Sequence, residues 1–233
     1  GVVSVVAEIN PLAAKKRYDQ GWVDELHDNL DELIPAIKRS VVEKRTVSMA
    51  YVGNVVDLWE RLADEGVHVD IGSDQTSLHN PWAGGYYPAD LTLEESKTMM
   101  AENPDEFRKH VQASLCRQVA AINRLAANGM YFFDYGNAFL LQSKRAGADI
   151  CTEDGKFRYP SYVQDIMGPM FFDYGFGPFR WVCTSGDAND LAVTDRIAAE
   201  VMEEIKRNAP EEIQGQMEDN IHWIREAGKN QLV

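Results

Sequence analysis

The first third of the chain alternates short apolar runs with helix-forming segments, and this alternation constrains the fold more than any other feature. Apolar runs typical of strands occupy residues 2–7, 46–52 and 67–71. Between these runs, Asn10-Pro11 and Asn54 are typical of helix starts. Strands that alternate with helices over short connections indicate a parallel α/β sheet. The valine-rich run at 2–7 further predicts a strand that is buried on both faces of that sheet.

The rest of the chain is predicted to be mostly helical. Residues 22–43 carry apolar side chains at helical spacing, interrupted at Pro35. Further helices are predicted over residues 91–101, 103–128, 188–207 and 211–228, with one strand starting at residue 130 and ending near Asp134. We therefore expect a Rossmann-like parallel sheet with flanking helices over residues 1–130. An aromatic and Gly-rich segment followed by C-terminal helices is expected over residues 131–233.

Polar side chains follow the predicted strands where each strand ends. Glu8 closes the first strand, Asn54 follows the second, and Asp74 to His79 follow the third. Because the carboxyl ends of parallel strands meet at one edge of a sheet, ligands bind there. The segment 71–88 combines turn formers, amides, hydroxyls and aromatic rings, as ligand-binding loops do. The alternatives are a solvated carboxylate at Glu8 and ordinary surface turns at the other two positions.

Charge and cysteine content exclude several functional classes. The formal net charge of −14 argues against nucleic acid and against an anionic membrane surface as partners. The 3 cysteines are widely spaced and form no CxxC pair, so we expect reduced thiols and no metal site. No apolar run approaches the ~20 residues that span a bilayer.

Several sequence blocks together resemble one enzyme family. They are Asp74-Gln-Thr-Ser-Leu-His-Asn-Pro81 with Gly84-Gly-Tyr-Tyr-Pro88, Phe133-Asp-Tyr-Gly-Asn137, and Gly175-Phe-Gly-Pro-Phe-Arg-Trp181. In this order the blocks resemble urocanase, the NAD-dependent family of histidine breakdown. The resemblance implies that the full-length protein adds water to urocanate and gives imidazolonepropionate. It also implies that NAD⁺ serves as an electrophile and not as a hydride carrier.

The resemblance assigns binding roles to particular residues. The position at strand ends independently supports Glu8, Asn54 and Gln75. The expected cofactor-binding residues are Glu8, Asn54, Val55, Gln75, Thr76, Ser77, Leu78, His79, Tyr86, Tyr87 and Tyr135. Arg180 is expected to bind the substrate carboxylate, because a guanidinium can hold a carboxylate through two hydrogen bonds. A structural arginine stacked on aromatic rings is the alternative. His79 has the residue type of a proton-transfer group, but the family pattern places it at the cofactor, and the catalytic residues stay unassigned.

Urocanases are considerably longer than this chain, so we expect it to be a central portion of such an enzyme. The first strand and the Gly-rich phosphate loop would precede Gly1, and further residues would follow Val233. Without that loop we expect the 233-residue chain to be inactive alone and to bind NAD weakly. A homodimer and a cytoplasmic location are also expected. The competing functions are a dehydrogenase that uses the same crevice and a non-catalytic dinucleotide-binding module.

Overall fold

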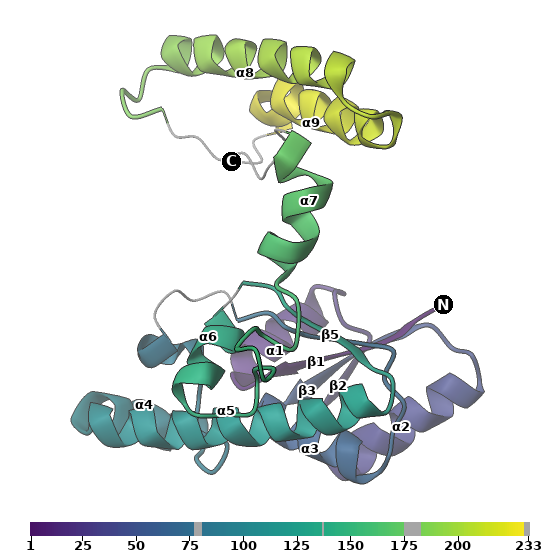
Figure 1. The fold of residues 1–233 in the computed structure, drawn as a ribbon, viewed down its shortest axis with the longest axis vertical. Helices are drawn as coiled ribbons and strands as arrows, with labels where there is room; N and C mark the ends of the chain where they lie inside the picture. The colour runs from purple at the N-terminus through teal and green to yellow at the C-terminus, as the bar shows by residue number, and fades with distance from the viewer. Residues whose placement is uncertain (77–80, 137, 175–182, 231–233) are drawn as a thin grey trace. The chain divides into compact units, whose positions relative to one another are not determined.

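A computed structural model describes residues 1–76, 81–136, 138–174 and 183–230 of the chain (Figure 1). The chain divides into two compact units, Gly1–Tyr162 and Val163–Val233. The first unit has the Rossmann-like α/β architecture predicted from the sequence.

The strands of the first unit form two small parallel sheets. The first sheet has the order β1-β3-β2, with β1 at Val3–Glu8, β3 at Val47–Val52 and β2 at Glu25–His27. The second sheet pairs β4 at Ile71–Asp74 with β5 at Tyr131–Asp134. Within each sheet the strands end level with one another, since Glu8 pairs with Val52 and Asp74 with Asp134. Each sheet therefore presents its carboxyl ends at one edge.

Helices connect the strands, and α1 and α3 begin at the polar caps that the sequence predicted. Their bounds are α1 Pro11–Asp19, α2 Leu30–Val42, α3 Val55–Asp64, α4 Leu93–Glu102, α5 Pro104–Ala127 and α6 Ala138–Arg145. Asn10 and Asn54 each accept a hydrogen bond from a backbone N–H in the first turn of α1 and α3. Thr92 and Glu95 form a capping box at the start of α4.

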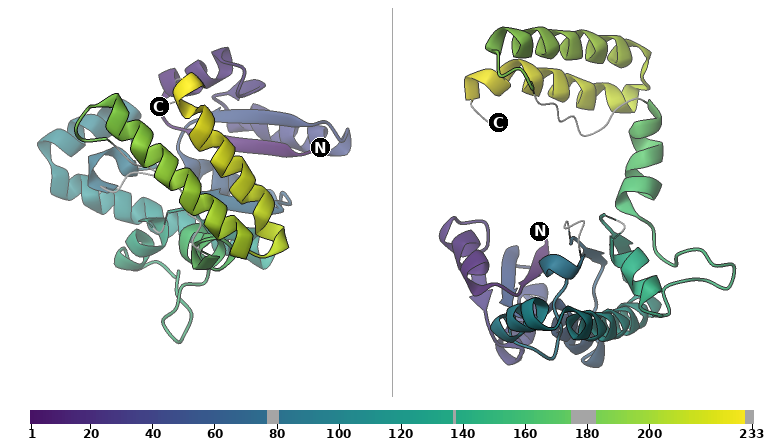
Figure 2. Two further views of the ribbon diagram at one scale, coloured as in Figure 1. Left: turned by 90° about the horizontal axis from the view of Figure 1, so that it is seen from above. Right: turned by 90° about the vertical axis from the view of Figure 1, so that its left-hand side faces the viewer.

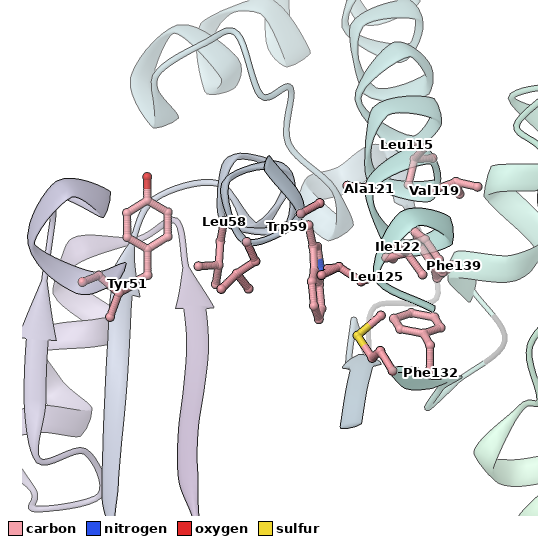
Figure 3. Close-up of a cluster of buried hydrophobic side chains, with 14 of the residues drawn as sticks. Tyr51, Leu58, Trp59, Leu115, Val119, Ala121, Ile122, Leu125, Phe132 and Phe139 are labelled. Atoms are coloured by element: carbon pink, nitrogen blue, oxygen red, sulfur yellow. The ribbon is translucent and has the colours of Figure 1, made fainter. Parts of the chain in front are cut away.

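Trp59 and Phe132 occupy the centre of the core in the first unit (Figure 3). The ring of Phe132 packs edge-on against Trp59 from α3, with ring centroids 6.3 Å apart, and against Phe139 from α6 at 5.7 Å. Leu125 and Ile122 from α5 complete this part of the core and are fully buried. Apolar side chains from α3, α5, α6 and β5 thus share one core.

The described part of the second unit is helical. A short helix, α7 (Gly168–Met170), follows a helical turn, η2 (Tyr162–Met167), and precedes another, η3 (Phe172–Tyr174). Two long helices, α8 (Ala188–Asn208) and α9 (Glu211–Asn230), lie side by side as a hairpin (Figure 2). They pack through a small cluster of Met202, Ile213, Met217 and Ile221. No helix within the described ranges has both the length and the apolarity to cross a bilayer.

Three local predictions were wrong. Residues 25–27 form strand β2 at the outer edge of β3, although their apolar spacing predicted a helix from residue 22. Backbone pairing with Ser48 holds Asp24 at the start of this strand, so tertiary pairing overrides the local pattern. The strand predicted over 67–71 instead occupies Ile71–Asp74, where it can pair with β5.

The third error concerns burial of β1. It lies at an edge of its sheet, and the side chain of Val6 is 53% exposed, so the strand is not covered on both faces. The expected boundary after residue 130 also differs from the contact-based division after Tyr162. That division places residues 131–162 with the first unit because β5 pairs with β4 and Phe132 fills the core. A functional boundary near residue 130 stays a prediction.

Replacing the buried ring of Phe132 tests this account of the core. We expect Phe132→Ala to lower the free energy of unfolding of the first unit by about 3–5 kcal/mol, because it leaves a cavity beside Trp59. The neighbouring ring of Tyr131 is 52% exposed, so Tyr131→Ala is the matched control and should cost below about 1 kcal/mol. Urea denaturation followed by tryptophan fluorescence measures both. Equal losses would contradict the assigned core.

Candidate functional site

The carboxyl ends of β1 and β3 bring Glu8 and Asn54 to the same edge of the first sheet. The backbone N–H of Gly53 donates to the carbonyl oxygen of Glu8 at 3.1 Å, which fixes the two strand ends side by side. Oε1 of Glu8 accepts from the backbone N–H of Asn10 at 2.8 Å, so the start of the following turn orients the carboxylate. An added Cβ at Gly53 would lie 2.4 Å from the ring of Tyr51, so a larger residue here would force that ring to move.

Asn54 and Tyr86 connect this edge to the edge of the second sheet. Oδ1 of Asn54 caps α3 by accepting from the N–H of Val56 at 3.0 Å, while Nδ2 donates to the carbonyl oxygen of Tyr87 at 3.0 Å. The neighbouring Tyr86 directs its hydroxyl to Oδ1 of Asp74 at 3.5 Å. The loop that contains Tyr86 and Tyr87 is therefore held at both sheet edges.

Asp74, at the end of β4, organises the second edge. Its Oδ1 accepts from the N–H of Thr76 at 3.0 Å, and its carbonyl oxygen accepts from the N–H of Tyr135 at 3.0 Å. Tyr135 stacks on Tyr162 with ring centroids 5.2 Å apart and an interplanar angle of 14°. The strand-end cluster, as we call it, consists of Glu8, Asn54, Asp74, Thr76, Tyr86, Tyr87 and Tyr135.

Two buried carboxylates lie in register beneath the second edge. Asp134 is fully buried, and burial raises its pKa to about 6 although backbone N–H groups, including those of Leu140 and Gly136, donate to it. Burial also raises the pKa of Asp74, against the opposing effect of hydrogen bonds from Thr76, Gln118 and Tyr86. The nearby negative charge of Asp74 further raises the pKa of Asp134. This edge thus holds carboxyl groups that release their protons less readily than ordinary aspartates.

The structure brings most of the predicted cofactor residues together at these two edges. Val55 is the first residue of α3 and partly buried, and Gln75 is exposed beside Thr76. Tyr135 is 45% exposed, whereas Tyr86 is only 7% exposed and faces Asp74. Ser77, Leu78, His79 and Arg180 lie outside the described residues.

Sequence reasoning missed Gln118 and Asp134. Gln118, in the middle of α5, is 2% exposed and donates from Nε2 to Oδ2 of Asp74 at 3.2 Å. A signal was present, because Gln118 lies between Leu115 and Ile122 on the mostly apolar buried face of α5. A polar residue on such a stripe needs a buried partner. Asp134 stands in one of the blocks that carried the resemblance but received no role.

Chemically, the strand-end cluster suits a ligand with several polar groups. Glu8 offers a carboxylate, Asn54 lies at the N-terminus of α3, and Tyr135 offers a partly exposed phenol. Carboxylate, amide and phenol groups can exchange hydrogen bonds with the hydroxyl and amide groups of a polar organic ligand. In the described residues, no group of His, Cys, Asp and Glu side chains is arranged to hold a metal.

Comparison with known proteins gives consistent matches along the whole chain. The Urocanase Rossmann-like domain matches residues 1–166, and the Urocanase C-terminal domain matches residues 169–233. A probable urocanate hydratase of Caenorhabditis elegans is 54% identical over 239 residues, which cover 100% of this chain and 36% of that protein. The urocanate hydratase of Mus musculus is 52% identical over 242 residues, again with 100% and 36% covered. The chain spans about a third of the length of these curated relatives.

The raised pKa of Asp134 predicts a pH-dependent effect of Asp134→Asn on stability. The folded pKa of about 6 exceeds the ordinary value of 3.8, so the stabilising effect of the protonated carboxyl is complete below about pH 4 and is lost as the pH rises through 6. We expect the unfolding free energy of the unchanged chain, relative to Asp134→Asn, to fall by about 3 kcal/mol or less between pH 4 and pH 8. Urea titrations at several pH values measure this difference, and a constant difference would contradict the prediction.

Proposed function

Because the chain belongs to the urocanase family, we propose that it forms part of a urocanate hydratase. This enzyme adds water to the small-molecule substrate urocanate and gives imidazolonepropionate. The observation that carries the proposal is the match over the full chain to proteins called urocanate hydratase. The strand-end cluster supports it, because several of the residues expected from the resemblance meet at neighbouring sheet edges and take part in hydrogen bonds there.

We further propose that NAD⁺ is the bound cofactor. When bound, it supplies an electrophilic ring that activates urocanate without transferring hydride. Glu8 would accept hydrogen bonds from the ribose hydroxyls, as an acid at this strand end does in dinucleotide-binding folds. Asn54 and Val55, at the N-terminus of α3, would bind through backbone N–H groups, and Tyr135 would bind through its phenol.

Other residues of the proposal extend the site along the chain. The residues that directly follow β4 in the sequence would also bind NAD⁺, namely Gln75, Thr76, Ser77, Leu78 and His79. Tyr86 and Tyr87 would also belong to the NAD⁺ site. Because Tyr86 is buried and directs its hydroxyl to Asp74, it would support the site through Asp74. Arg180 would bind the carboxylate of urocanate as a bidentate partner.

The assembly and location of the enzyme belong to the same proposal. We expect a homodimer in the cytoplasm. The thiols of Cys116, Cys151 and Cys183 are free, as in a reducing compartment. The 233-residue chain alone is expected to be inactive and to bind NAD weakly.

The deciding experiment assays the longer protein, which joins this chain to flanking segments like those of its relatives. We expect NAD to copurify and the conjugated absorbance of urocanate to decay during turnover. No absorbance of reduced nicotinamide should appear, which separates a hydratase from a dehydrogenase. Bound NAD without any decay of urocanate would favour a non-catalytic module and overturn the proposal.

Arg180→Lys in that longer protein tests the substrate contact. Lysine keeps the charge but loses the planar pair of donors, so we expect KM for urocanate to rise by about 10-fold with unchanged NAD content. Arg158→Lys is the control, because Arg158 pairs with Asp149 on the surface and should leave KM unchanged. Steady-state kinetics measure both variants. An unchanged KM in Arg180→Lys would remove this residue from the substrate site.

A further inference from the structure

Gln118 is a buried amide in a helix that otherwise packs as part of the core. It lies on the same stripe of α5 as Leu115, Ile122 and Leu125, and its side chain is 2% exposed. Burying an amide is unfavourable unless hydrogen bonds replace those it loses to water. An aliphatic side chain of similar length could fill this space, so packing alone does not explain a glutamine here.

The hydrogen bond of Gln118 connects α5 to Asp74 of the strand-end cluster. Its Nε2 donates to Oδ2 of Asp74 at 3.2 Å. The other carboxylate oxygen, Oδ1, accepts from the N–H of Thr76 at 3.0 Å and from the hydroxyl of Tyr86 at 3.5 Å. One oxygen of Asp74 thus faces α5, and the other faces the two segments that carry the expected cofactor residues.

This division between the two oxygens fixes the rotation of the carboxylate. Asp74 is 6% exposed, so few water molecules can replace a lost donor. Without the amide of Gln118, the carboxylate would rotate or reorganise to find another donor. Its bonds to Thr76 and Tyr86 would then lengthen or break. Because Tyr87 adjoins Tyr86 and accepts from Asn54, the disturbance would extend to the edge of the first sheet.

We propose that Gln118 is a positioning residue for the dinucleotide, acting through the carboxylate of Asp74 on Thr76 and Tyr86 without touching the ligand itself. This proposal rests on the proposed function, in which Thr76, Tyr86 and Tyr87 bind NAD⁺. It assigns to α5 the role of fixing Thr76 and Tyr86 before the ligand binds. Such preorganisation raises affinity, because no binding free energy is then used to order these residues.

The test compares two buried glutamines in the longer protein proposed above. Gln118→Met removes the donor to Asp74 and keeps the side-chain length. Gln142→Met is the matched control, because Gln142 is also buried, and its Oε1 has no hydrogen-bond partner within the described part of the chain. We expect NAD to bind about 10-fold more weakly to Gln118→Met, as follows from losing a hydrogen bond to a charged group. Gln142→Met should change the NAD dissociation constant by less than about 2-fold.

Gln118→Glu distinguishes positioning from a general loss of stability. A protonated glutamic acid can donate to Asp74, whereas an ionised one repels it. The titratable group that contacts Gln118 is the carboxyl of Asp74 on β4, and the hydroxyl of Tyr86 and the carboxyl of Asp134 on β5 lie near that carboxyl. We expect Gln118→Glu to bind NAD more tightly than Gln118→Met near pH 6 and to lose this advantage as the pH rises. Thermal midpoints measured beside each titration identify any variant that has merely unfolded.

The outcomes separate this inference from the function on which it rests. If the unchanged longer protein binds no NAD, the proposed function fails and the inference fails with it. If the unchanged protein binds NAD and Gln118→Met binds it as tightly as Gln142→Met, only the inference is overturned. Weaker binding confined to Gln118→Met, with pH-dependent recovery in Gln118→Glu, supports both.

Discussion

The packing of Trp59 on the second sheet is the contact on which the arrangement of the first unit depends. Trp59 belongs to α3, which follows β3 of the first sheet, and its ring lies against β4 and Phe132 of the second sheet. The close approach requires Gly72, since an added Cβ would lie 2.9 Å from the Trp59 ring and 2.7 Å from the sulfur of Met130. Trp59 therefore joins α3, which follows the first sheet, to the second sheet within one core.

A fixed separation of the sheets lets short polar side chains connect their edges. Asn54 donates to the carbonyl oxygen of Tyr87, and the hydroxyl of Tyr86 lies against Asp74. The connecting side chains have few hydrogen-bond donors and are largely buried. Each buried polar group therefore relies on its neighbours for hydrogen bonds. Asp74 is the most dependent, because its donors come from the following loop, from Tyr86 and from α5. The strand-end cluster is in this sense an extension of the core.

How far the sequence predicted the structure differed from element to element. Helix caps were predicted well because the capping side chain bonds to backbone within its own first turn, as at Asn54. Strands were predicted less well, since pairing with distant segments decides them, as β2 and the start of β4 show. The expected cofactor loop could be recognised by its composition, but the amide that supports it could not be assigned a partner. Gln118 and Asp74 are far apart along the chain, and no local pattern links them.

The sequence by itself determined the α/β class, the family and the polar character of the strand ends, because periodicity, caps and motif blocks are local properties. Only the tertiary structure decided which polar groups meet. It placed Tyr86 inward against Asp74, aligned Asp74 with Asp134, and brought Gln118 beneath them. The physical reason is that burial and long-range hydrogen bonds depend on distances between segments, which the packing of helices on sheets sets after each element has formed. The raised pKa of Asp134 has the same origin, since desolvation exists only in the folded core.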